Sequence, residues 1–167
     1  MDIKEAIEFI KLKHGNQKRK QGTPYYTHPI AVAELLKNKG FSLEYQLTGL
    51  FHDLLEDTEC TYQEIINLSN DKVLEAVKLL TKTDGYIMSD YIKNIEKNDI
   101  AKMTKLADRI HNLSEATEAS YKFQEKYIEE TKEWFVSLAK GTVFEKELNK
   151  ALYNLIKFYE KNKTNSI

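Results

Sequence analysis

Hydrophobic residues recur at helical spacing along most of the chain. Ile3, Ala6, Ile7 and Ile10 fall on one face of a helix with 3.6 residues per turn, and similar spacing returns in the later segments. The pattern predicts a helix near 3–10, others that begin at about 29, 42, 61 and 73, and later ones over about 89–96, 99–113, 125–139 and 144–158. The sequence therefore predicts an all-α protein.

Local signals support these helix boundaries. Pro29 suits the first turn of a helix, Ser42 suits an N-cap, and Thr61 followed by Glu64 is a capping-box pattern. Two prolines and six glycines are too few to form the turns between many short strands. We find no internal repeat. We expect the helices to pack as one bundle.

Length and composition predict one domain with one hydrophobic core. The chain has 167 residues, of which 41% are hydrophobic, which suffices without disulfides or structural metals. We predict a single domain over 1–160 and a frayed tail over 161–167. The lone cysteine, Cys60, cannot pair within the chain, and no secretory signal is evident, so a cytoplasmic location is expected.

Charge and hydropathy exclude several classes of partner. The chain has 25 Lys and Arg against 26 Asp and Glu, a formal net charge of −1. This balance argues against non-specific binding to nucleic acid or to anionic membranes. No apolar run approaches the roughly 20 residues that cross a bilayer. Any anion site must therefore be local, and the oligomeric state has no signature in the sequence.

Polar residues interrupt the most apolar predicted helix, 42–57. His52 and Glu56 are four residues apart, as are Asp53 and Asp57, so two polar stripes would emerge from one side of that helix. A cation would satisfy both stripes. The same peptide also fits a hydrogen-bonded core histidine beside a solvated acidic helix end.

Two further positions favour a metal site. His28 precedes Pro29 at a predicted helix start, and Asp108 lies in a predicted helix with Lys105 and Asn112 near it on one face. Two imidazoles and two carboxylates suit manganese, iron, nickel or zinc. A salt-bridged surface helix is the alternative for the segment around Asp108.

Together these residues resemble a known signature. His28, the His52-Asp53 pair and Asp108 resemble the H…HD…D pattern of the HD phosphohydrolase superfamily. Four blocks, at 17–29, 52–58, 81–82 and 105–113, are similar in order to the hydrolase domain of RelA/SpoT proteins and to small alarmone hydrolases. A bare HD pair is weak evidence, whereas four ordered blocks over about two-thirds of the chain are specific.

The resemblance implies an HD-domain helical bundle and a metal-dependent hydrolase. His28, His52, Asp53 and Asp108 would hold one divalent ion, which is manganese in the alarmone hydrolases. Such an ion lowers the pKa of bound water from about 16 towards about 7. An acidic pair beside the ligands would position or deprotonate the attacking water, and its members here are Glu56 and Asp57.

The resemblance also implies a substrate. Arg19 and Lys20 match an Arg-Lys pair near the guanine and phosphates, Lys82 a lysine near the pyrophosphate, and Asn112 a residue near the ribose. Removal of pyrophosphate from the 3′ position of guanosine tetra- or pentaphosphate, giving GDP or GTP, is the expected reaction. Each of these polar residues taken alone would also be typical of a solvated surface.

Three departures bear on substrate choice. Asn16 replaces the usual Gly before Gln, Ser114-Glu115 replaces the usual Arg-Thr, and the segment between Lys82 and Lys105 is short. An adenosine alarmone, a nucleoside monophosphate and the 2′-phosphate of NADPH therefore compete with the guanosine compound as substrates. Two rival functions are a non-catalytic module that binds a nucleotide or a partner protein, and an HD-type nuclease, which the near-zero net charge disfavours.

Overall fold

The computed structural model describes residues 2–164, in which helices are joined by loops, the longest of them over 15–26. Between residues 2 and 164 there is no strand, only an isolated bridge between Lys18 and Pro24. The expected all-α class is confirmed. The helices are α1 (Ile3–His14), α2 (Thr27–Asn38), α3 (Leu43–Phe51), α4 (Leu54–Asp57), α5 (Tyr62–Leu68), α6 (Asp71–Leu80), α7 (Met88–Glu96), α8 (Asp99–Glu115), a 3-10 turn (Ala116–Glu118), α9 (Tyr121–Glu130), a π-helical turn (Thr131–Phe135), α10 (Val136–Ala139) and α11 (Glu145–Thr164).

Three predicted helices have different boundaries in the structure. The helix expected over 42–57 is interrupted at His52 and Asp53, which separate α3 from α4. The helix expected over 125–139 begins at Tyr121 and contains the π-helical turn. The last helix continues to Thr164, so the tail predicted from 161 begins as helix, while 165–167 lie outside the described residues. The single-domain assignment over 1–160 stays a prediction.

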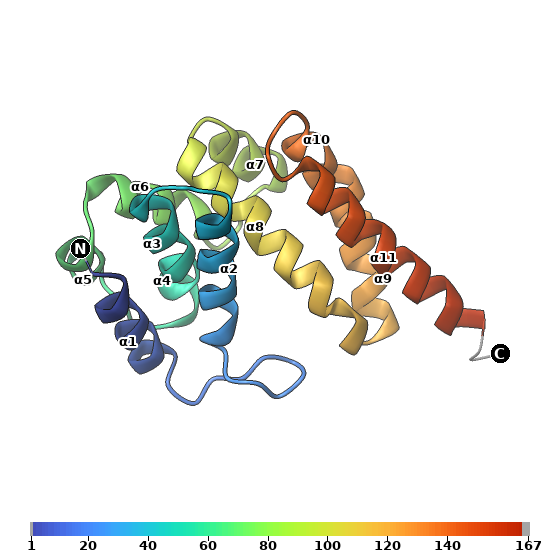
Figure 1. Cartoon of the computed structure of the whole chain (residues 1–167), viewed down its shortest axis with the longest axis horizontal. Coiled ribbons are helices and arrows are strands. Elements are labelled where there is room, and N and C mark those ends of the chain that lie inside the picture. The colour runs from blue at the N-terminus through green and yellow to red at the C-terminus, as the bar shows by residue number, and fades with distance from the viewer. Residues whose placement is uncertain (1, 165–167) are drawn as a thin grey trace.

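Helix α8 runs between two groups of helices. In Figure 1, α1 to α6 lie on one side of α8, and α9 to α11 lie on the other. The buried apolar side chains form two clusters, where the composition had suggested one core. The clusters meet on α2, because Val32 belongs to one cluster and the adjacent Ala33 to the other. They also meet on α6, where Ala76 and Val77 belong to different clusters, so α2 and α6 connect the two clusters.

Close packing of α2 against α3 brings two of the candidate residues together. A Cβ atom on Gly49 would lie 3.0 Å from a methyl group of Leu36 and 3.2 Å from the backbone of Ala33. Glycine lets the two helices approach at this point. His28 on α2 and His52 at the end of α3 consequently face each other, with ring centroids 5.2 Å apart.

Of the local signals read from the sequence, Pro29 lies in the first turn of α2 as expected, whereas Ser42 takes the N-cap position of α3 without a side-chain hydrogen bond. Thr61 and Glu64 form the expected capping box at the start of α5. α8 is capped by Asn98, whose side chain accepts from the backbone N–H of Ala101 at 2.9 Å. Among the described residues, no helix combines the length and apolar character needed to cross a bilayer.

Candidate active site

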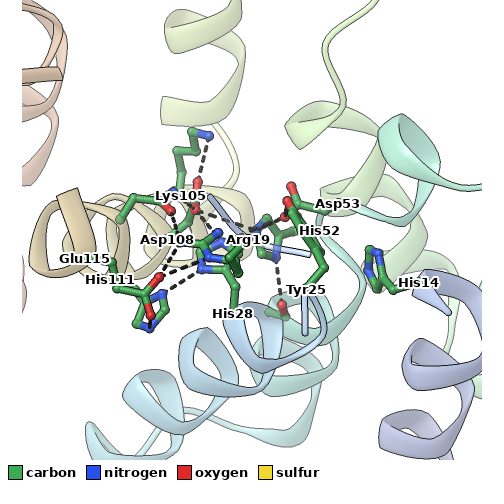
Figure 2. Close-up of polar contacts among 12 residues, drawn as sticks. His14, Arg19, Tyr25, His28, His52, Asp53, Lys105, Asp108, His111 and Glu115 are labelled. Atoms are coloured by element: carbon green, nitrogen blue, oxygen red, sulfur yellow. Dashed lines mark hydrogen bonds and ion pairs between the residues drawn. The ribbon is translucent and has the colours of Figure 1, made fainter. Parts of the chain in front are cut away.

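Four side chains from three places in the chain converge beside α8 (Figure 2). Nε2 of His28 lies 3.0 Å from Oδ1 of Asp108, and Nε2 of His52 lies 3.1 Å from Oδ2 of Asp53. The cross distances are 3.8 Å from His28 to Asp53 and 3.7 Å from His52 to Asp108. The four residues predicted as metal ligands therefore form one compact group.

The end of α3 determines how His52 is oriented. Nδ1 of His52 lies 2.8 Å from the backbone oxygen of Gly49, so Nδ1 carries the proton that is donated there. Nε2 is buried and faces Oδ2 of Asp53 at 3.1 Å, and it makes no aligned hydrogen bond among the described residues. A buried polar atom without a partner is costly unless a ligand satisfies it.

A divalent cation fits this group. One ligand atom from each of His28, His52 and Asp108 lies within 4.8 Å of the other two. All three residues are buried, so the carboxylate and the imidazoles need partners. Two nitrogen donors with carboxylate oxygen match manganese, iron or zinc. The buried Nε2 of His52, which faces two carboxylates without an aligned hydrogen bond among the described residues, and the donor set both favour a metal centre.

Mutual contacts shift the pKa values of these groups. Burial lowers the pKa of His28. Burial would also lower the pKa of His52, but Asp53 and Asp108 outweigh it and raise that pKa well above its usual value. Burial opposes ionisation of Asp108, yet Lys105 and the two histidines hold its pKa well below the usual range. The group therefore holds anionic carboxylates that a cation can bind.

Neighbouring side chains hold the two carboxylates in place. Asp108 accepts from Nδ2 of Asn112 at 2.7 Å and from Nζ of Lys105 at 2.8 Å. Asp53 accepts from the hydroxyl of Tyr25 at 2.8 Å. Hydrogen bonds of this kind orient metal ligands and tune their basicity.

Glu56 and Asp57, the predicted acidic pair, both lie on α4, after the break that separates this helix from α3. Glu56 lines the same cleft as the histidines, and its carboxylate accepts a short hydrogen bond from the backbone N–H of Lys82. Asp57 is absent from the described lining of that cleft, and its backbone oxygen accepts from Gln17 at 2.7 Å. Desolvation by surrounding protein raises the pKa of both carboxyls. The expectation of continuous polar stripes on one helix was therefore wrong.

The cleft continues into a second hollow. The cleft has a volume of about 290 Å³, and the adjoining chamber has about 300 Å³. Arg19, Tyr25, Asn112 and Phe123 line both, so the two are neighbours. We call the first the metal cleft, which is lined by Arg19, Tyr25, His28, His52, Asp53, Glu56, Leu80, Lys82, Lys105, Asp108, Arg109, Asn112, Phe123, Lys126, Tyr127 and Glu130. We call the second the loop chamber, which is lined by Lys18, Arg19, Lys20, Gln21, Tyr25, Asn112, Glu115, Ala116, Glu118, Ala119 and Phe123.

The predicted substrate residues divide between the two hollows. Lys82 lines the metal cleft, where its Nζ lies 5.2 Å from the ring centroid of Tyr86. Lys20 lines the loop chamber, with Nζ 3.3 Å from the ring centroid of Phe123. Arg19 and Asn112 lie between the hollows and are hydrogen-bonded to each other at 2.9 Å.

The far wall of the metal cleft contains residues that the sequence did not single out. Arg109 is buried between the rings of Tyr127 and Phe135, at 4.2 and 4.0 Å, and pairs with Glu130 at 2.5 Å. Lys126 lies on the same wall. The available signal in the sequence was the spacing of three between 127 and 130, which places these two residues on one face of the helix predicted over 125–139. These residues give the cleft both cations and an acid.

Comparisons with known proteins agree with this geometry. The HD domain family profile matches residues 6–142. A guanosine-3′,5′-bis(diphosphate) 3′-pyrophosphohydrolase of Aquifex aeolicus is 37% identical over 147 residues, which cover 83% of this chain and 21% of the relative. The bifunctional (p)ppGpp synthase/hydrolase SpoT of Escherichia coli is 33% identical over 123 residues, or 66% of this chain and 17% of SpoT. The chain thus spans about a fifth of these relatives' length.

Two solved structures share the fold. A metazoan ortholog of SpoT that hydrolyzes ppGpp superposes with a TM-score of 0.77 at 24% identity, covering 90% of this chain and 93% of that one. A protein from Listeria monocytogenes gives a TM-score of 0.62 at 25% identity, covering 80% of this chain and 98% of that one. The helical arrangement around the four ligand candidates is therefore a recurrent one.

Proposed function

The chain belongs to the HD domain family, and from this premise we propose that it removes pyrophosphate from the 3′ position of guanosine tetra- or pentaphosphate. The single observation that carries the proposal is the group of His28, His52, Asp53 and Asp108 in a cleft that Lys82, Lys105 and Lys126 also line. The relative in Aquifex aeolicus is named for this 3′-pyrophosphohydrolase activity, and the relative in Escherichia coli is named a bifunctional (p)ppGpp synthase/hydrolase. Both names support a guanosine polyphosphate as the substrate.

These four residues would hold one divalent ion, for which we propose Mn²⁺. A bound divalent ion neutralises charge on phosphoryl oxygens and makes water acidic enough to ionise near neutral pH. Tyr25 would keep Asp53 oriented through its hydroxyl hydrogen bond. The mixed nitrogen and oxygen donors support this class of ion, and zinc and iron remain its competitors.

Glu56 is the residue we assign as general base. It lines the cleft with the ligand group, and a carboxylate there can take the proton from the water that attacks phosphorus. The bond between the 3′ oxygen and its phosphorus then breaks, which releases pyrophosphate and leaves a nucleoside 5′-diphosphate or 5′-triphosphate. Asp57 would act through Tyr25 and Gln17 rather than on the water itself, since only Glu56 of the pair lines the cleft in the described structure.

The two hollows would share the substrate. Lys82 and Lys126 on the metal cleft would face the phosphate oxygens, where positive charge is favourable. Phe123, with Lys20 over its ring, would offer the nucleoside an aromatic surface in the loop chamber. We also propose a cytoplasmic location, supported by a single cysteine, Cys60, which cannot form a disulfide within the chain.

A substrate panel tests this proposal. Metal-stripped protein, with and without added Mn²⁺, is incubated with guanosine tetraphosphate, its adenosine counterpart, NADPH and a nucleoside monophosphate, and products are resolved by anion exchange. We expect Mn²⁺-dependent formation of GDP and pyrophosphate. A matched His52→Ala protein, shown to be folded by circular dichroism, should form neither product.

The remaining outcomes have distinct meanings. Turnover of the adenosine compound or NADPH alone would retain the metal site and reject the guanosine substrate. The contact between Glu115 and Arg19 is the observation that favours a changed substrate, because it neutralises a cation between the hollows. If no compound is turned over, the enzymatic hypothesis is wrong, and a non-catalytic module that binds a nucleotide becomes the favoured function.

A further inference from the structure

Glu115, the last residue of α8, lies where the loop before α2 meets the metal centre. Its Oε2 accepts from Nε and Nη2 of Arg19, at 3.0 and 2.7 Å, and from Nε2 of Gln21 at 2.6 Å. Its Oε1 lies 3.3 Å from Nε2 of His111. One carboxylate thus contacts two residues of the loop and one residue of α8. Figure 2 shows Glu115 with His111 on one side and Arg19 on the other.

The first path from Glu115 towards the metal centre runs through the loop. Arg19, held by Glu115, also donates through Nη2 to Oδ1 of Asn112 at 2.9 Å. Asn112 in turn donates through Nδ2 to Oδ1 of Asp108 at 2.7 Å. Because Arg19 gives both Nε and Nη2 to Glu115, the orientation of its guanidinium plane is fixed. The loop is therefore tied to a residue of the ligand group.

The second path runs through two histidines. Nδ1 of His111 lies 2.7 Å from Nδ1 of His28, so one ring donates and the other accepts. If Nε2 of His28 is a metal ligand, its proton is on Nδ1, and His111 must accept at Nδ1 and carry its own proton on Nε2. That proton faces Oε1 of Glu115. The carboxylate favours this arrangement of protons over the reverse one.

We propose that Glu115 is a positioning residue that couples the loop carrying Arg19 to the metal centre through His111 and His28. It acts on the metal centre through His111 and His28, and on the loop chamber through Arg19. One oxygen orients Arg19 in the loop chamber, and the other selects the His28 tautomer that leaves Nε2 free to bind a cation. This inference rests on the metal site proposed above.

A simple surface ion pair would not have these properties. Exposed pairs contribute little, with a median near 0–1 kcal/mol. The Arg19 and Glu115 side chains are 12% and 28% exposed, and Glu115 contacts three partners from two elements. Partial burial and shared partners are the conditions under which a carboxylate can orient others.

Metal affinity tests the histidine path without any substrate. Glu115→Gln is compared with wild type by titrating metal-free protein with Mn²⁺ against a chelating dye. We expect about 10-fold weaker binding, the size typical for loss of a partner that orients a ligand. Glu8→Gln is the matched control, because it removes the same charge from an exposed pair with Lys11 on α1 and should bind Mn²⁺ like wild type.

Nucleotide binding tests the loop path without turnover. Calorimetry with GDP and metal-free protein should show about 10-fold weaker binding by Glu115→Gln, because the neutral amide oxygen of Gln holds the guanidinium plane of Arg19 more weakly than the carboxylate does. His111→Phe separates the two paths. In that background Glu115→Gln should weaken GDP binding as before but cause no further loss of Mn²⁺ affinity.

Each result supports or overturns the coupling. Folded Glu115→Gln protein that binds Mn²⁺ within two-fold of wild type overturns the histidine path, and with it the proposed coupling, even if GDP binding weakens. Loss of Mn²⁺ affinity that persists equally in the His111→Phe background also overturns it. If the wild-type protein binds no divalent ion, the proposed function itself is wrong. That outcome is distinct from the two that overturn only the coupling through Glu115.

Discussion

The metal cleft and the loop chamber adjoin each other but are built differently. The ligand group in the cleft comes from α2, the end of α3 and α8, and its histidines are almost fully buried. The chamber is formed by the loop after α1 and by the 3-10 turn after α8, and its charged residues are more exposed. Helices position the proposed metal ligands at one end, and a loop held by side-chain contacts lines the proposed nucleotide chamber at the other.

This difference predicts which substitutions should change turnover and which should change substrate affinity. Removing a ligand leaves buried charges unpaired, because each member of the group depends on the others. Removing a chamber residue exposes groups that water can solvate. We therefore expect losses of turnover from the metal cleft and losses of affinity from the chamber.

The largest effect should follow from His52→Ala or Asp53→Ala. Each removes a proposed ligand, so Mn²⁺ binding should be lost and kcat should fall by about 10³-fold or more. Steady-state kinetics and a dye-competition titration measure the two quantities. Wild-type turnover by folded variants would show that the ligand group does not support catalysis.

Glu56→Gln should have the next largest effect. Loss of a general base lowers kcat by roughly 10²- to 10⁴-fold, while the ligand group should still bind Mn²⁺. Asp57→Asn serves as the comparison, because Asp57 does not line the cleft in the described structure. A greater loss of kcat in Asp57→Asn than in Glu56→Gln would reverse our assignment of the base.

The pH profile gives a separate view of Glu56. Desolvation raises the pKa of this carboxyl above 4.5, and only the ionised form can accept a proton. Activity should therefore fall as the pH falls through the raised pKa, at a higher pH than an ordinary Glu would give. The acid limb of kcat/KM should move or disappear in Glu56→Gln. An unchanged acid limb would assign the titration to another group.

Lys20→Ala should have a smaller effect, confined to affinity. Lys20 lies over Phe123 in the chamber and away from the ligand group, so KM should rise by about 10-fold with little change in kcat. Lys126→Ala, on the wall of the metal cleft, provides the contrast and should lower kcat as well. Equal effects on kcat in both variants would remove the distinction between the two hollows.

The sequence revealed the metal end better than the chamber. Helical spacing and the ordered blocks predicted the convergence of His28, His52, Asp53 and Asp108. They missed the break after Phe51, because a helix interruption inside an apolar run carries no Pro or Gly. The π-helical turn and the Arg109–Glu130 pair were also missed, since they depend on packing between α8 and α9.

Glu115 illustrates the same limit at the chamber. In the sequence it was a departure from the family pattern that cast doubt on nucleotide recognition. In the structure it holds Arg19 and Gln21 and faces His111. Contacts between residues separated by more than 90 positions cannot be read from spacing along one chain.

Thr61→Ala should have the smallest effect on the site. It removes the capping box of α5, remote from both hollows, and should lower the free energy of unfolding by about 1 kcal/mol. Kinetic constants at 25 °C should match wild type. Denaturant unfolding checks the stability change, and altered kinetics would show that the site depends on the far end of the bundle.

Hydrolysis of guanosine tetraphosphate in ¹⁸O-labelled water, with Mn²⁺ present, tests the central claim most directly. Mass spectrometry then locates the label in the products. Attack of water on phosphorus with cleavage of the 3′ oxygen bond predicts unlabelled GDP and pyrophosphate that carries one ¹⁸O. Label in GDP, release of orthophosphate alone, or no products would contradict the proposed 3′-pyrophosphohydrolase.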